Sequence, residues 1–139
     1  HLNVEQFIVT TSGRDSLDPF LNSALKTHLE FFSGIITYED VSNHKPLPDA
    51  YNLAIKLSKK ANTNCIAIED SKIGIEAAKS ANINVLLTLP PWTSSNDEIS
   101  KIANACVDSL GNTTKQSKLI YGKPLIKNVD FAYLTNIIN

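Results

Sequence analysis

Cysteine, arginine and basic clusters are scarce in this chain of 139 residues. The two cysteines, Cys65 and Cys106, lie far apart in apolar stretches and lack the spacing of a metal site. We interpret both as buried, reduced thiols, which predicts a cytoplasmic setting. Arg14 is the only arginine, the net charge is −1, and no lysine cluster forms a basic stripe. We therefore expect no nucleic-acid binding.

Long hydrophobic runs are absent as well. The apolar stretches are short and interrupted, which excludes a membrane-spanning helix, and the first residues show no basic segment followed by an apolar one, so we expect no secretory signal. Hydrophobic residues nevertheless make up 42% of the chain and charged residues 19%. This composition predicts one folded domain with a buried core.

Short apolar strands alternate with amphipathic helices along most of the chain. Strands are expected at residues 7–10, 34–37, 65–68 and 83–87. Helices are expected at 16–29, with Phe20 on the apolar face, and from Pro48 to about Leu57, with Leu57 on the inward face. Ser71 can cap a third helix, which carries Ile75, Ala78 and Ala81 inward.

Beyond a proline-rich break at 88–97, we expect a short helix near 96–102 and an outer strand and turn at 105–111. The tail from Gly111 is interpreted as a surface loop followed by a final helix at 130–139. This order predicts an α/β, Rossmann-like fold with a parallel sheet and helices on both faces.

The carboxyl ends of the first three strands carry the polar groups that are best placed for chemistry, because ligands collect at that edge of a parallel sheet. The hydroxyl-rich turn suits a phosphate, or it is an ordinary capped turn. The lysine, which lies between a polar loop and two prolines, suits a phosphate, or it is a solvated loop residue. The pair of acids suits Mg²⁺, or it lies beside the N-terminus of a helix. These groups are Thr10, Thr11 and Ser12, then Lys45, and then Glu69 and Asp70. His44, beside the lysine, is interpreted as exposed and without a function.

Three segments together carry a resemblance to a known family. VTTS at 9–12, HKPLPDAY at 44–51 and IAIEDSKIGIEAAKSANI at 66–83 resemble the haloacid dehalogenase-like (HAD) hydrolase superfamily. The combination KPxPDxY and EDSxxGxxAA is most similar to the branch of β-phosphoglucomutase, phosphoglycolate phosphatase and CbbY-like phosphatases. The resemblance implies a HAD-like core domain and an enzyme that acts on a small phosphorylated metabolite, such as a sugar phosphate.

The resemblance also implies roles for the residues at the strand ends. Thr10 would hydrogen-bond the transferring phosphoryl group, with Thr11 and Ser12 completing the phosphate-binding turn, and Lys45 would neutralise charge between nucleophile and phosphate. Thr10 and Lys45 are therefore the expected catalytic residues of this chain. Asp70 would ligate Mg²⁺ directly and Glu69 would act through water or outer contacts, while Asp49 and Ser71 would order the loops.

The chain departs from the family at one decisive point. The family's first motif, an Asp-x-Asp that supplies the nucleophile and general acid, occurs nowhere in the sequence, and the helical cap domain is missing as well. We therefore interpret residues 1–139 as the C-terminal portion of a HAD-like core domain. In the family's strand order the nucleophile strand lies between the strands at 7–10 and 65–68. We expect an incomplete sheet that needs an N-terminal segment, self-association or local rearrangement.

Two other readings stay open from the residues. The chain could be a non-catalytic phosphate- or cation-binding fragment or an interaction module, because Lys45 and Asp70 alone cannot form an aspartyl-phosphate. A response-regulator-like domain also uses acids and a lysine at strand ends, but its acidic pair follows the first strand, which here ends in Thr-Thr-Ser. Phosphatase and phosphomutase are not distinguished, and Trp92 is interpreted as structural packing.

Overall fold

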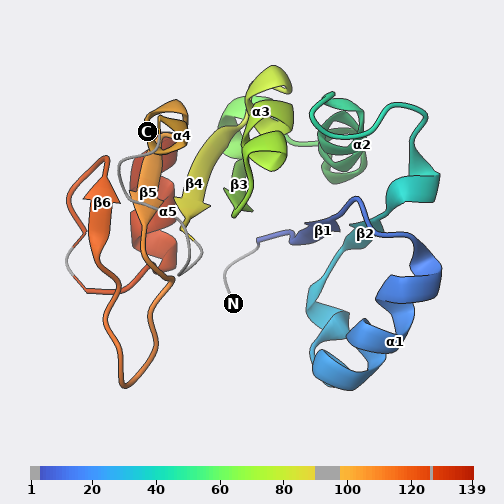
Figure 1. Cartoon of the computed structure of the whole chain (residues 1–139), viewed down its shortest axis with the longest axis horizontal. Helices are drawn as coiled ribbons and strands as arrows, with labels where there is room; N and C mark the ends of the chain where they lie inside the picture. The colour runs from blue at the N-terminus through green and yellow to red at the C-terminus, as the bar shows by residue number, and fades with distance from the viewer. Residues whose placement is uncertain (1–3, 90–97, 126) are drawn as a thin grey trace.

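The computed structural model describes residues 4–89, 98–125 and 127–139. The proline-rich stretch that contains Trp92 and most of the break at 88–97 lie outside these residues. Strands and helices alternate as expected over the first two-thirds of the chain (Figure 1). The strands are β1 Phe7–Val9, β2 Gly34–Ile36, β3 Ile66–Glu69, β4 Asn84–Thr88, β5 Ala105–Val107 and β6 Leu119–Tyr121. The helices are α1 Arg14–Ala24, α2 Asp49–Ser58, α3 Lys72–Ser80, α4 Ile99–Ile102 and α5 Phe131–Ile138, with short 3₁₀ turns at Leu29–Phe31, Tyr38–Asp40 and Asn62–Asn64.

The described strands form two separate sheets. Strands β1 and β2 pair in parallel, and β3, β4, β5 and β6 form a second sheet in that order. Within the larger sheet β3, β4 and β5 are parallel and β6 is antiparallel to β5. Strands β1 and β3 do not pair with each other, and Figure 1 shows the β1–β2 pair beside α1 and apart from the larger sheet. The α/β, Rossmann-like prediction is confirmed, with its sheet in two parts.

Helices cover both faces of the larger sheet because side chains alternate along each strand. Val85 and Leu87 on β4 pack in one cluster with Ala77 and Ala78 of α3, all fully or almost fully buried. The residue between those two strand positions, Leu86, packs instead in a second cluster on α5. The inward face of α3 was predicted correctly: Ile75, Ala78 and Ala81 are all buried. These two cores fix the orientation of β3 and of the residues at its end.

The structure corrects several predicted elements. Helix α1 ends at Ala24 rather than near Leu29, and Phe20, expected on its apolar face, is exposed. Leu57, expected inward on α2, is also exposed. The strand expected at the outside of the sheet, β5, lies between β4 and β6, because the stretch interpreted as a surface loop contains β6. Strand β6 has no fully buried residue, whereas all three residues of β5 are buried, so β6 lacks the buried apolar run by which β5 was predicted.

No helix among the described residues is long and apolar enough to cross a membrane.

Candidate functional site

The ends of β1 and β3 are joined by one lysine. The Nζ of Lys45 donates to the backbone oxygen of Val9, the last residue of β1, at 3.1 Å and to Oε1 of Glu69, the last residue of β3, at 2.5 Å. The side chains of Lys45 and Glu69 are only 7% and 8% exposed. Lys45 therefore crosses between two strands that do not pair with each other.

The position of Lys45 depends on its neighbours in the chain. Pro46 follows it through a cis peptide bond, and Pro48 caps α2, whose first turn begins at Asp49. The carboxylate of Asp49 accepts a hydrogen bond from the side-chain nitrogen of Asn43 at 2.9 Å, across the loop that carries the lysine. The prolines restrict the backbone on one side and this contact closes the loop on the other.

Glu69 has a second buried partner. The hydroxyl of Tyr51, on α2, donates a short hydrogen bond to Glu69 Oε1, the same oxygen that accepts from Lys45. Tyr51 is buried, and the Lys45 ammonium lies 4.9 Å from the centre of its ring. Burial and the Glu69 carboxylate raise the pKa of Tyr51, so the phenol stays protonated and acts as a donor. A buried carboxylate with two donors is far less costly than an unpaired one.

Gly74 gives Glu69 the room it occupies. A Cβ at this position in the first turn of α3 would collide with the Glu69 carboxylate. The same turn is capped by Ser71, whose hydroxyl accepts from Gly74 N at 3.2 Å, so the predicted cap is confirmed. Close approach of α3 to the end of β3 therefore requires glycine here.

Asp70 differs from its neighbour because successive residues at a strand end face opposite sides. Asp70 is exposed, and no hydrogen bond or ion pair of its carboxylate joins it to another residue in the described part of the chain. No group of three or more His, Cys, Asp or Glu side chains in the described ranges could by itself hold a metal ion. Mg²⁺ commonly uses one or two carboxylates together with water and substrate phosphate. Asp70 fits that partial role, and Glu69 is already occupied.

The polar groups of the hydroxyl-rich turn after β1 already make hydrogen bonds, both within the turn and to the segment after β2. Oγ1 of Thr10 accepts from Ser12 N at 3.1 Å, and Ser12 O accepts from Tyr38 N at 3.3 Å. Thr10 is half-buried, whereas Thr11 and Ser12 are exposed. Because Thr10 accepts with its oxygen, its hydroxyl hydrogen is still able to donate to an anion.

The start of α1 has a cap from elsewhere in the chain. Glu39 Oε1 accepts from Arg14 N at 3.0 Å, in place of a side chain at the helix's own cap residue, Gly13. The Arg14 guanidinium pairs with Asp40 at 3.1 Å, and Asp40 also accepts from Thr37. A carboxylate therefore occupies part of the N-terminus of α1, next to the predicted phosphate-binding turn.

His44 differs from its prediction as an exposed residue. Its ring stacks on Tyr38 with centroids 3.8 Å apart, and Nδ1 is buried with no partner among the described residues. Sequence reasoning also gave no role to Tyr51 or to Gly74. Both occupy fixed positions in the quoted motifs, at the end of KPxPDxY and in EDSxxG, and those positions were the only signal for them.

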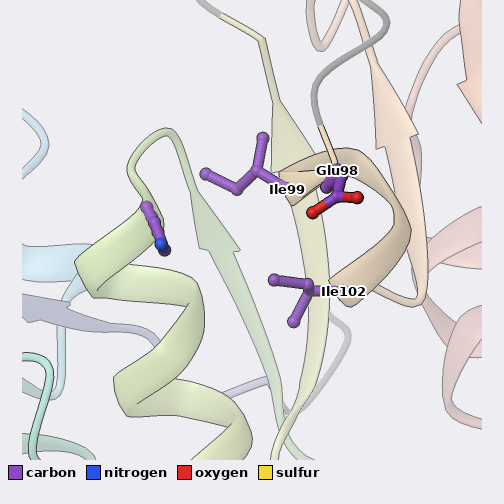
Figure 2. A pocket seen from close by; sticks show the side chains of 4 residues that line it. Glu98, Ile99 and Ile102 are labelled. Carbon is purple, nitrogen blue, oxygen red and sulfur yellow. The ribbon is translucent and has the colours of Figure 1, made fainter.

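A separate pocket of about 400 Å³ lies beside the start of α3. Its lining comes from Lys72 and from Glu98, Ile99 and Ile102 of the α4 region, and Figure 2 shows the two isoleucines projecting toward α3. None of Lys45, Tyr51 and Glu69 lines this pocket. A single cation opposite a carboxylate and two aliphatic side chains gives no anion-binding site.

Comparison with known proteins identifies the family of this chain. The family model of haloacid dehalogenase-like hydrolases matches residues 1–88. Protein CbbY of Rhodobacter capsulatus is 31% identical over 91 residues, which are 65% of this chain and 40% of that protein. The fructose-1-phosphate phosphatase YqaB of Escherichia coli is 32% identical over 66 residues, 45% of this chain and 35% of that protein.

A solved structure has a similar fold. CbbY from Rhodobacter sphaeroides, in complex with phosphate, aligns with a TM-score of 0.67 and 26% identity over 76% of this chain and 47% of that one. The chain thus spans less than half the length of these relatives. The matching family model, which covers more than half of the chain, and the neighbours in the CbbY-like branch show that the chain belongs to the haloacid dehalogenase-like hydrolases.

Proposed function

We propose that this chain is the lysine-, phosphate- and metal-binding part of a Mg²⁺-dependent phosphatase or phosphomutase. The observation that carries the proposal is the buried Lys45, which links the end of β1 to Glu69 at the end of β3. Lys45 lies at the carboxyl ends of parallel strands, where ligands bind in such sheets. A cation fixed there can stabilise the negative charge that spreads over the oxygens of a transferring phosphoryl group.

Each site residue has a distinct role in this proposal. The Thr10 hydroxyl donates to a phosphoryl oxygen, and the turn through Thr11 and Ser12 surrounds the anion with further donors. Lys45 compensates the charge of the nucleophile and of the transferring group. Asp70 holds Mg²⁺ directly, and when bound the ion supplies charge compensation to the phosphate oxygens.

The nucleophile comes from outside these 139 residues, since the sequence contains no Asp-x-Asp. A carboxylate oxygen would attack phosphorus and displace the alcohol oxygen of the substrate, and water or a second hydroxyl would then release the phosphoryl group from the aspartyl-phosphate. The lack of pairing between β1 and β3 supports a strand between them. That strand would be an N-terminal segment of the same protein or would come from another copy.

The substrate class is a small phosphorylated metabolite such as a sugar phosphate. The name of YqaB as a fructose-1-phosphate phosphatase and the phosphate complex of CbbY support this class. Cys65 and Cys106 are free thiols, which supports a reducing, cytoplasmic setting. Cys106 is buried as predicted, whereas Cys65 is only partly buried. Neither observation separates a phosphatase from a phosphomutase.

A second candidate is a non-catalytic phosphate- or cation-binding module, which the absence of Asp-x-Asp favours. One experiment separates the two. Hydrolysis of p-nitrophenyl phosphate and a sugar-phosphate panel is measured with Mg²⁺ or EDTA, for the 139 residues alone and for a form extended at the N-terminus by a strand carrying Asp-x-Asp and a cap. We expect Mg²⁺-dependent turnover by the extended form only, abolished by Asp70→Ala and by Lys45→Ala. Turnover by the 139 residues alone would contradict the assignment of the nucleophile, and no turnover by either form would favour the binding module.

A further inference from the structure

Tyr51, on α2, contacts both members of the buried ion pair. Its hydroxyl donates to Glu69 Oε1, and its oxygen lies 3.5 Å from Lys45 Nζ. The rest of its side chain is part of the larger hydrophobic core, together with Ala67 of β3 and Ile75 of α3. A rigid ring held by a core is a better anchor than a flexible chain, because little rotamer freedom remains to be lost.

The carboxylate of Glu69 is confined on two sides. Tyr51 holds Oε1 from α2, and Gly74 of α3 lies so close to the carboxylate that a methyl group would not fit. The backbone oxygen of Glu69 also accepts from the Thr88 hydroxyl at 3.3 Å, which ties this end of β3 to β4. The Glu69 side chain thus has little space to turn toward the exposed Asp70.

We propose that Tyr51 is a positioning residue that fixes Glu69 as the counter-ion of Lys45 and leaves Asp70 as the metal-facing acid of the pair. The effect on catalysis rests on the proposed function. The positioning of Glu69 and Lys45 by Tyr51 does not, and it can be tested in the 139-residue chain. Two adjacent acids then have separate tasks: the buried one places the lysine, and the exposed one meets the cation. Tyr51 acts through Glu69 and Lys45 and touches no reacting atom.

The test measures the accessibility of Lys45 in the 139-residue chain. Folded protein is briefly acetylated with an N-hydroxysuccinimide ester of acetate, and the modification of Lys45 is divided by that of exposed Lys60 in the same sample. Tyr51→Phe should raise this ratio by roughly tenfold, as expected when a hydrogen bond to a charged group is lost. Tyr133→Phe is the matched control, because Tyr133 is equally buried, its hydroxyl donates to Lys123 O at 3.1 Å, and it packs in the other core. Its ratio should stay at the wild-type value.

A second variant checks that Tyr51 acts through the carboxylate. Glu69→Gln keeps the side-chain shape but removes the charge, and should itself raise the Lys45 ratio. Adding Tyr51→Phe to it should then change the ratio less than twofold, because the two residues act as one unit. A Tyr51→Phe ratio within twofold of wild type, or two effects that multiply, would overturn the inference.

The kinetic readout belongs to the extended, active form. There Tyr51→Phe should lower kcat by about tenfold with little change in KM, since it displaces the lysine that acts on the transferring group. If the wild-type extended form has no phosphatase activity, the proposed function is wrong, but the labelling result still tests the positioning role of Tyr51. A normal kcat in Tyr51→Phe, in an enzyme that is active, would overturn the inference alone.

Discussion

Replacement of Lys45 by methionine isolates the contribution of the buried ion pair to folding stability. The change keeps an unbranched side chain of similar length but removes the ammonium, so Glu69 loses its 2.5 Å partner and the Val9 carbonyl loses its 3.1 Å donor. Tyr51 alone then supports the carboxylate. Removing one partner of a buried pair costs about 3–5 kcal/mol, because the remaining charge is left uncompensated. We expect a loss of about 3 kcal/mol in the free energy of unfolding, since the new methyl group offsets part of the cost by apolar burial.

The assay is urea unfolding followed by circular dichroism at neutral pH. Lys60→Met is the control, because Lys60 is exposed, and should change stability by less than about 0.5 kcal/mol. The double variant Lys45→Met/Glu69→Gln should recover much of the loss, since the neutral amide can still accept from Tyr51 and no buried charge remains. Equal effects of Lys45→Met and Lys60→Met would refute the reasoning, as would a double variant with strictly additive losses.

Four further predictions concern the surroundings of the site, the start of α1 and the core. Gly74→Ala should cost about 2 kcal/mol by overpacking, measured in the same assay, and Ser71→Ala about 1 kcal/mol by loss of the α3 cap; a neutral effect of either would contradict the contact assigned to it. The Thr37 backbone N–H and hydroxyl lower the pKa of Asp40, so its stabilising contribution is present above pH ~3.8 and is lost as pH falls through the lower folded value. Asp40→Asn should therefore lower the free energy of unfolding at pH 7, and this loss should shrink as the pH falls through the lowered pKa of Asp40. Burial raises the pKa of Cys106 to about 11, so this thiol should react with Ellman's reagent at pH 8 only after unfolding; rapid reaction in the folded protein would contradict its burial.

The sequence by itself determined the fold class, because the order of strands and helices follows from patterns among neighbouring residues. The strand at 66–69 and the inward face of α3 follow from apolar runs and helical spacing, which depend on neighbouring residues. The family could also be identified from the sequence, since KPxPDxY and EDSxxGxxAA are each contiguous motifs. Strand β6 was not predicted, because none of its three residues is fully buried and the run is flanked by polar sequence. The early end of α1 was not predicted either, because tertiary contacts override helix propensity.

Only the tertiary structure decided which polar groups meet. No local pattern showed that Lys45 donates to the backbone of β1, that Glu69 shares one oxygen between a lysine and Tyr51, or that Glu39 caps α1 from another segment. These contacts join residues 18 to 36 positions apart. Their partners are chosen by the packing of α2 and α3 around the end of β3, where a buried charge must find donors or remain costly.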